Sequence, residues 1–460
     1  MPVDDTPIRP ADLAPVFAPC LARREGRPIA LAVSGGSDST ALMVLFADWL
    51  RQAGADPAVH TVLTVDHRLR PESAGEVREV AGRAAALGFS HEALVWEGEK
   101  PRSGLQAAAR RARYRLMCDY LRAHAIDMLL TAHTRDDQAE TLLMRLARGS
   151  GLDGLGAMAP WLELGPGAGT GAVQIARPLL GVAKARLRAT LEERGIPWIE
   201  DPSNQSLAFE RTRWRAARGN LEALGLSGEM LALSARRLQR ARTALEAVTD
   251  QYCAEGAGMV HTDRCGLFRI DREKLRRAPE EIALRVIGRC IAAAGGSGEA
   301  VPLAKLESMV AKLWSGKACN ATGSRTLARA QITATGDVVQ VEREPGRQAL
   351  PVLTVAAGAK ALWDGRFRIA IADGFEGSLD VRPLGGSGLA VLKRAGIAVK
   401  GTSALRLVAS FWRENELLAV PAIDFWARQD LEGRISADFA GFAYNSGADG
   451  GIPTDDLDTC

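Results

Sequence analysis

The chain has 460 residues, of which 47% are hydrophobic, and a net charge of only +3 at pH 7. No apolar stretch approaches the roughly 18–20 residues of a membrane span, and the first residues lack the pattern of a signal peptide, so we expect neither feature. The seven cysteines are scattered and never spaced as Cys-x-x-Cys. This favours reduced thiols in a cytoplasm and disfavours a zinc or iron–sulfur site.

Residues 25–200 alternate short apolar runs with helix-like segments, which is the pattern of βαβ units around a parallel sheet. The predicted strands are Ile29–Val33, His60–Val65, His91–Val95, Met128–Thr131 and Val173–Ala176. The predicted helices are Thr40–Ala53, Gly75–Leu87, Leu105–His124 and Asp136–Arg148. We therefore expect an α/β fold with a doubly wound parallel sheet. Ligands of such sheets bind beyond the carboxyl ends of the strands, where strand order reverses.

The loop after the first predicted strand reads Ser34-Gly35-Gly36-Ser37-Asp38-Ser39. The two glycines let the backbone turn tightly, and the amides before a helix N-terminus favour an anion such as pyrophosphate. Asp38 is suited to capping the helix or to holding Mg²⁺. Ordinary strand-to-helix turns also contain Gly, Ser and Asp. The complete string after a buried strand is more specific, and it lacks the spacing of a Walker loop.

Two more polar groups are expected at this edge of the sheet. Asp66 and His67 follow the second strand. They are either close to a bound nucleotide or an ordinary polar strand end, and this segment by itself favours neither interpretation. Arg110 and Arg113 lie three apart on a helix, so they share a face beside Tyr114. Arginines at this spacing suit contact with phosphate or carboxylate, whereas the alternative is a solvated basic face.

The fourth strand is followed by His133 and by three carboxylates, Asp136, Asp137 and Glu140. We expect Asp136 to be the helix N-cap. Asp137 and Glu140 then fall three apart, where they can share Mg²⁺ or accept a proton. The sequence therefore predicts an acidic helix start close to the glycine loop.

An arginine-rich stretch comes next, with eight arginines and three glutamates between residues 205 and 245. Beside a nucleotide site it predicts a nucleic-acid track, and the alternative is a long amphipathic helix with a basic face.

The pattern of the remaining chain changes twice. From Leu221 to about Trp314 it is mostly helical, most clearly over Leu231–Ala247 and Pro279–Ala294. From about Ala328 it becomes short β-like runs separated by turns, including Gly385–Gly388. These runs are Ala330–Ala334, Val338–Glu342, Phe367–Ile371, Leu405–Val408 and Leu417–Val420. Residues 446–460 are expected to be disordered.

Taken in chain order, the motifs resemble the tRNA(Ile)-lysidine synthetase family of PP-loop ATP pyrophosphatases. The resemblance covers about the first 215 residues, at Ser34–Ser39, Asp66–Arg70, Ala109–Tyr114, Ala132–Thr141, Arg145–Gly151, Arg177–Leu180 and Asp201–Asn204. The match to the family's C-terminal tRNA-binding domain is looser, at Val381–Gly388 and Leu417–Pro421. The chain has Arg211-Thr212-Arg213 where the family usually has Arg-Asn-Arg, and residues 393–406 also depart from the family pattern.

The resemblance implies a PP-loop domain at 1–215, a helical tRNA-contacting domain at 216–325, an α+β tRNA-binding region at 326–445 and the tail at 446–460. It also implies a reaction that uses ATP and Mg²⁺. ATP adenylates the C2 oxygen of the wobble cytidine in the CAU anticodon of tRNA(Ile), and the amine of free L-lysine then attacks C2 and expels AMP. The location is expected to be cytoplasmic. The oligomeric state stays open, with a homodimer as one candidate.

The implied roles follow the motifs. ATP is expected at Ser34, Gly35, Gly36, Ser37, Asp38, Ser39, Asp66 and His67, with Mg²⁺ on Asp38 and Asp137. The catalytic group is Asp38, Arg110, Arg113, His133, Asp137 and Glu140. Asp137 or Glu140 attracts the lysine ammonium, and a carboxylate or His133 accepts its proton. Contacts with tRNA are expected from Arg145, Arg148, Arg177, Asn204, Arg211, Arg213 and Arg215.

Two rival functions remain. One is a base-thiolating PP-loop enzyme, which is disfavoured because the cysteine nearest to a motif, Cys118, lies inside a predicted helix. The other is a non-catalytic RNA-binding relative, which is disfavoured by the intact glycine loop and acidic groups.

Overall fold

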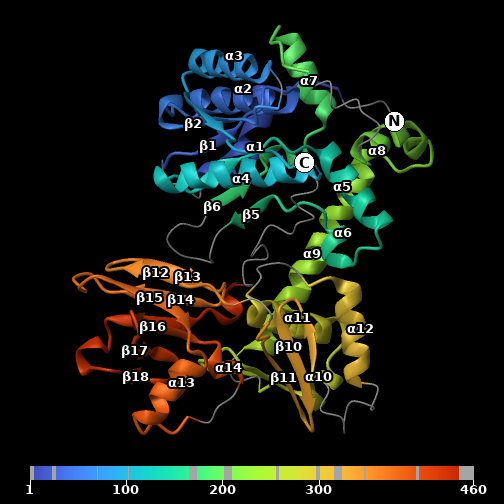
Figure 1. Ribbon diagram of the computed structural model, residues 1–460. Coiled ribbons are helices and arrows are strands. Elements are labelled where there is room, and N and C mark those ends of the chain that lie inside the picture. Colours follow the sequence, from blue (N-terminus) through green and yellow to red (C-terminus); the bar gives the residue numbers. More distant parts are fainter. Residues whose placement is uncertain are drawn as a thin grey trace. The chain divides into compact units, whose positions relative to one another are not determined.

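The computed structural model describes residues 5–22, 27–69, 71–101, 103–164, 173–200, 210–254, 258–296, 301–314, 324–346, 349–399 and 403–444. It divides within helix α9 (Gly228–Cys253) into two compact units, one up to Thr243 and one from Ala244 (Figure 1). Asn204 and the tail at 446–460 lie outside the described residues.

A six-stranded sheet with the order β3-β2-β1-β4-β6-β5 forms the centre of the first unit. The strands are β1 (Ala30–Ala32), β2 (Thr61–Asp66), β3 (Ser90–Val95), β4 (Met128–Leu130), β5 (Trp161–Leu164) and β6 (Val173–Ala176). All neighbours are parallel except β5, which runs antiparallel to β6. The five predicted strands are confirmed, and only β5 was not predicted. Strand order reverses at β1, because β2 pairs with one of its edges and β4 with the other.

Helices cover both faces of this sheet, which confirms the doubly wound α/β fold. The helices in the two cores against the sheet are α1 (Pro10–Ala22), α2 (Ser37–Gln52), α3 (Ser73–Leu87), α4 (Leu105–Ala123) and α7 (Lys184–Glu193). The other helices of this unit, α5 (Arg135–Ala147), α6 (Leu152–Leu155), α8 (Glu210–Ala223) and the start of α9, pack against one another in a separate cluster. The four predicted helices are confirmed, with small shifts at their ends. Short 3₁₀ helices lie at Pro57–Val59 and Pro178–Gly181.

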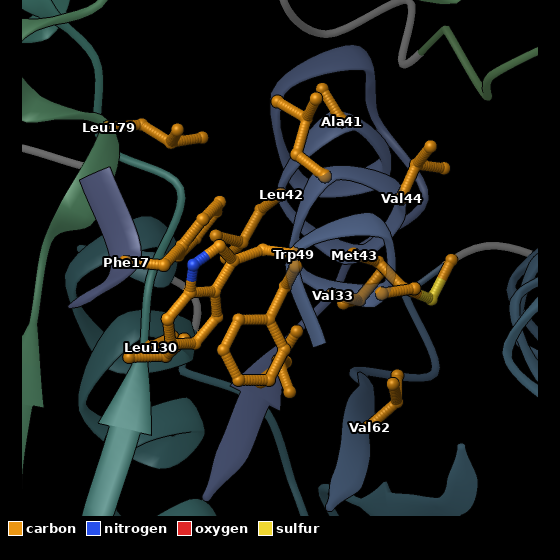
Figure 2. Close-up of a cluster of buried hydrophobic side chains, with 14 of the residues drawn as sticks. Phe17, Val33, Ala41, Leu42, Met43, Val44, Trp49, Val62, Leu130 and Leu179 are labelled. Atoms are coloured by element: carbon orange, nitrogen blue, oxygen red, sulfur yellow. The ribbon is translucent and has the colours of Figure 1, made fainter. Parts of the chain in front are cut away.

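The larger core lies around α2, the helix that follows the glycine loop. Phe17 of α1 packs edge-on against Phe46 of α2 with ring centroids 5.4 Å apart, and Figure 2 shows Phe17, Leu42 and Trp49 together with Leu130 of β4. Burying each such side chain stabilises the fold by about 1.5–3 kcal/mol. The core therefore fixes α2, and with it the loop that precedes it.

The second unit begins with a five-stranded antiparallel sheet in the order β7-β8-β11-β10-β9. Its strands are β7 (Val260–Thr262), β8 (Phe268–Asp271), β9 (Arg325–Leu327), β10 (Ala330–Thr335) and β11 (Val338–Arg343). Three helices accompany them, α10 (Arg272–Arg277), α11 (Glu280–Gly295) and α12 (Leu303–Trp314). The expected boundary between residues 325 and 326 falls inside β9, so the mostly helical region and the strands that follow share one sheet.

The C-terminal part of this unit has two more antiparallel sheets, β12-β15-β16-β17-β18 and β13-β14-β19. The strands are β12 (Leu353–Ala356), β13 (Lys360–Trp363), β14 (Phe367–Ile371), β15 (Ser378–Pro383), β16 (Ala409–Arg413), β17 (Glu416–Val420), β18 (Phe425–Trp426) and β19 (Ile435–Phe439). The helices are α13 (Gly385–Arg394) and α14 (Ser403–Arg406), with 3₁₀ turns at Pro421–Ile423, Gln429–Leu431 and Gly441–Tyr444.

Two predictions in this part are wrong. The run Leu405–Val408 is not a strand, because α14 covers its start and β16 begins only at Ala409. Its apolar residues are buried, and a short buried run has the same composition in a helix as in a strand. Gly385–Gly388 is not a connection between strands, because these residues form the start of helix α13. A side chain on Gly388 would collide with Leu384 and contact Trp412, so glycine allows the close packing there.

No helix among the described residues combines the length and the apolar composition needed to cross a bilayer.

Candidate active site

The glycine loop connects β1 to α2 at the reversal of strand order. Gly35 has a φ of +86°, and a Cβ there would lie 2.5 Å from Ile199 Cδ1. The N–H of Ile199 also donates to the carbonyl of Gly35 at 2.9 Å. Both the left-handed backbone and the close approach of Ile199 therefore require glycine at this position.

Hydroxyl groups hold the loop in shape from within. Ser39 Oγ accepts from the N–H of Ser34 at 3.2 Å and donates to the carbonyl of Gly36 at 3.1 Å. Thr40 Oγ1 donates to the carbonyl of Gly35 at 3.0 Å. The first amides of α2 have no acceptor within the helix, and they form the kind of N-terminus that binds anions.

Asp38, in the first turn of α2, pairs with a residue that the sequence did not point to. Lys184 Nζ donates to Asp38 Oδ2 at 2.8 Å, and Ser37 Oγ donates to Oδ1 at 3.2 Å. Burial raises the pKa of Asp38, Lys184 lowers it in part, and the nearby Asp137 raises it. The only signal for Lys184 was its position a few residues after the Arg177–Leu180 motif, and tertiary folding brings it to Asp38.

The start of α5 differs from the prediction. Its N-cap is Thr134 rather than Asp136, and the N–H and hydroxyl of Thr134 each donate to Asp137 Oδ2 at 2.8 Å. Asp137 thus completes a capping box. Asp136 instead accepts from the backbone N–H of Lys184 at 2.8 Å and pairs with Arg218.

Asp137 stays ionised despite its burial. Burial raises its pKa, but Arg211, His133, the Thr134 N–H and Lys184 all lower it, to about 2. His133 is buried, with Thr131 Oγ1 2.9 Å from its Nδ1. Burial and then Arg177 hold the pKa of His133 well below 6.5, so the ring is neutral at pH 7.

Glu140, one turn further along α5, is held by α8. Arg215 Nε and Nη2 donate to the two oxygens of Glu140 at 2.6 and 3.1 Å, and Arg211 Nε lies 3.6 Å from Oε2. Burial raises the pKa of Glu140, and the hydrogen bond from Arg215 opposes that rise. Two of the arginines predicted to contact tRNA therefore face the acidic helix here.

A second pair of predicted groups also comes together. Arg113 Nη2 lies 3.3 Å from His67 Nε2, and the His67 ring stands edge-on to Trp96 at 5.8 Å. Burial and then Arg113 lower the pKa of His67 to about 4. Asp66 Oδ1 accepts from the N–H of Arg68 at 2.8 Å and shapes the turn after β2.

Arg110 lies on the same helix, 5.1 Å over the ring of Tyr114. Its side chain is buried, and burial lowers its pKa to about 10, which leaves it charged at neutral pH.

The remaining predicted arginines differ in their surroundings. Arg145 donates to the carbonyls of Gly154 and Ala157 at 2.8 and 3.1 Å, and Arg177 donates to that of Ala159 at 2.6 Å. Only 5% and 3% of these two residues are exposed, so the geometry favours a structural role for both. Arg148 is more exposed and pairs with Glu210 at 2.6 Å, and Arg213 is exposed.

The described residues contain no group of three or more His, Cys, Asp and Glu side chains that could hold a metal ion. Asp38 and Asp137 are nevertheless close enough for one to raise the pKa of the other. Mg²⁺ is commonly bound through one or two carboxylates together with substrate phosphates and water. The pair therefore fits a magnesium ion that arrives with a nucleotide.

Comparison with known proteins agrees with this geometry. Residues 11–220 match the PP-loop domain family. A tRNA(Ile)-lysidine synthase of Bradyrhizobium diazoefficiens is 41% identical over 75% of this chain and 97% of its own length. That of Ruegeria pomeroyi is 37% identical over 86% of this chain and 88% of its own length.

Among solved structures, the U34-tRNA thiolase NcsA from Methanococcus maripaludis aligns with a TM-score of 0.40 and 15% identity over 50% of this chain and 77% of that chain. This likeness is too low to support an argument. The relatives at about 40% identity over nearly their full length are decisive. The chain belongs to the tRNA(Ile)-lysidine synthase family.

Proposed function

We propose that this protein ligates free L-lysine to C2 of the wobble cytidine in the CAU anticodon of tRNA(Ile), with ATP as the energy source. The observation that carries the proposal is the meeting of two helix starts where strand order reverses. There α2 supplies Asp38 and the glycine loop, and α5 supplies Asp137 and Glu140. The relatives at about 40% identity support the same reaction.

In the first step the C2 oxygen of the base attacks the α-phosphorus of ATP, and pyrophosphate leaves. The amides of the glycine loop are candidates to bind the departing negative charge. Asp38 and Asp137 would hold Mg²⁺, which supplies positive charge to the phosphates. Arg110, charged at neutral pH, would hold the α-phosphate or the adenylated base.

In the second step the lysine amine bonds to C2, and AMP leaves with the former C2 oxygen. The incoming ammonium has to be attracted and then lose a proton. Asp137 suits the first task because its pKa of about 2 keeps it ionised. Glu140 suits the second task because its raised pKa makes it the better base, and neutral His133 is the alternative acceptor.

The target base lies in a single-stranded loop, which can present it without opening a duplex. Arg148, Arg211, Arg213 and Arg215 are the proposed contacts near this site. For the C-terminal region, the proposed phosphate contacts are Arg413 and Arg434, two arginines whose guanidinium groups both lie 5.5 Å from the ring of Phe375. We place the protein in the cytoplasm with its tRNA, and a homodimer stays a prediction.

The test is incubation of the full chain with ATP, Mg²⁺, labelled lysine and unmodified tRNA(Ile) carrying a CAU anticodon. Lysine incorporation with equimolar AMP and pyrophosphate is the expected result. Binding of tRNA without either product would make the enzyme assignment wrong.

The rival thiolation reaction is tested by the same assay with Cys118→Ser. Cys118 is buried, and burial raises its pKa to about 11, so its thiol is protonated and a poor nucleophile. The variant should keep full lysine incorporation. A dependence of base modification on a sulfur donor would favour the rival.

A further inference from the structure

Lys184 joins the two helix starts that carry the proposed magnesium ligands. Its ammonium donates to Asp38 Oδ2 at 2.8 Å, and its backbone N–H donates to Asp136 Oδ2 at 2.8 Å. The N–H of Arg135 also donates to the carbonyl of Val182 at 2.9 Å. The main chain at residue 184 is thus tied to α5, while the side chain reaches across to α2.

The helix that presents Lys184 is itself well anchored. Leu187 and Leu191 of α7 are fully buried in the core that contains α2. The side chain of Lys184 is 32% exposed and that of Asp38 is 20% exposed, so a ligand from solvent can reach the pair. A fixed backbone with a reachable, flexible ammonium is suited to exchanging one partner for another.

The ammonium of Lys184 is paired with the carboxylate of Asp38. The ammonium of Lys184 lies 2.8 Å from Asp38 Oδ2, and its backbone N–H is bonded to Asp136, the residue directly before Asp137, so the carboxylates of Asp38 and Asp137 both lie near Lys184. The ammonium therefore serves as the counter-charge of Asp38, and together with Arg211 and Arg215 it reduces the repulsion between Asp38 and Asp137. This is the electrostatic role that a divalent cation would have at the same pair.

The geometry points to Lys184 as a positioning residue that takes the place of Mg²⁺ at Asp38 in the nucleotide-free site and moves to the phosphates of ATP when the magnesium nucleotide binds. The inference rests on the proposed function, because it takes magnesium–ATP as the ligand. Two cations on one carboxylate oxygen repel each other, so the metal displaces the ammonium. The four-carbon stem of lysine lets the displaced charge bind phosphate.

The experiment compares Lys184→Met, Lys184→Arg and a control, Lys305→Met, an exposed lysine on α12. Isothermal titration measures binding of Mn²⁺ alone, and then binding of ATP at saturating Mg²⁺. Lys184→Met should bind Mn²⁺ alone about fivefold more tightly, since a competing charge is gone. It should bind ATP about tenfold more weakly, since a phosphate contact is lost. Lys184→Arg should recover most of the ATP affinity, and Lys305→Met should match the parent.

The opposite signs distinguish this role from a structural one, because a damaged site would bind both ligands more weakly. Unchanged or weaker Mn²⁺ binding by Lys184→Met would overturn the inference. If that variant does not fold, Lys184→Gln takes its place with the same two expectations. Neither titration contains tRNA or lysine. Failure of lysine incorporation would therefore overturn the proposed function without changing the titration results. Titrations that contradict the role of Lys184 would likewise leave the lysine-incorporation result unchanged.

Discussion

Arg215 of α8 and Glu140 of α5 form a two-point ion pair, with both nitrogens of the contact between 2.6 and 3.1 Å from the carboxylate oxygens. Arg215 is therefore bound to Glu140, the carboxylate that we propose as the acceptor of the proton from lysine. An arginine expected to contact tRNA is thus bound to a carboxylate of the proposed lysine site. The arginine-rich helix α8 therefore contacts the proposed proton acceptor directly.

The first prediction concerns this pair. Arg215→Ala removes a cation that is bound to Glu140 and lies 3.9 Å from Asp137, the carboxylate proposed to attract the ammonium of lysine, so the KM for lysine should fall about threefold to tenfold. The KM for tRNA should rise, because Arg215 is also a proposed contact with the tRNA. Arg218→Ala is the matched control, because its partner on α5 is Asp136, and it should leave the lysine KM unchanged. A higher lysine KM in Arg215→Ala would contradict the competition.

The second prediction concerns the glycine loop. Gly35→Ala forces a side chain into a left-handed backbone and against Ile199, and it should destabilise the protein by about 1–3 kcal/mol and weaken ATP binding. Gly54→Ala is the control, since Gly54 also has a positive φ, +67°, but has open space around it. Its cost should be about 1 kcal/mol with ATP affinity unchanged. Equal effects of the two substitutions in urea unfolding and ATP titration would contradict the steric argument.

The third prediction concerns Asp38. Asp38→Ala removes a proposed magnesium ligand and should reduce lysine incorporation at least about 100-fold. The control is Asp48→Ala on the same helix, where the carboxylate pairs with Arg51 and Arg194. That variant should keep most activity in the labelled-lysine assay. Full activity in Asp38→Ala would refute the role assigned to the loop.

The fourth prediction concerns pH and Asp137. Its pKa in the folded chain is about 2, below its ordinary value of 3.8. The folded state therefore gains stability from the ionised carboxylate above pH 3.8, and this gain is lost as pH falls toward 2. Asp137→Asn should destabilise the first unit at pH 7 by about 1–2 kcal/mol, through loss of the capping box as well. The difference from the parent in urea unfolding should shrink in acid, and a constant difference would show that ionisation is irrelevant.

The fifth prediction separates arginines with a structural role from those proposed to contact RNA. Arg145→Ala should lower the unfolding midpoint, because buried Arg145 donates to the carbonyls of Gly154 and Ala157, and it should leave the salt dependence of tRNA binding unchanged. Arg213→Ala should reduce the slope of log K against log salt by about 1, because Arg213 is exposed and is proposed to contact a phosphate of tRNA. An unchanged unfolding midpoint together with a smaller salt slope in Arg145→Ala would contradict the structural role proposed for Arg145.

Much of the fold could be predicted from local patterns. Strands β1, β2 and β4 of the first unit are short, mainly apolar and largely buried, and such runs between amphipathic helices specify a parallel sheet. Short apolar runs without that alternation are ambiguous, which is why Leu405–Val408 was misassigned. The predicted N-cap of α5 is two residues late because Thr134 and Asp136 are both good capping residues, and the structure instead engages Asp136 with the N–H of Lys184 and with Arg218.

The sequence by itself determined the glycine loop, the acidic helix start, the sheet that brings them to one edge and the family to which the chain belongs, since each depends on residues adjacent in the chain. Only the tertiary structure decided which charges are partners. Lys184 and Asp38 are 146 residues apart, and Arg215 and Glu140 are 75 apart. Long charged side chains have no preferred partner in an unfolded chain. Their pairing depends on which helix starts the buried core brings within a few ångströms, and that is a property of the packed fold.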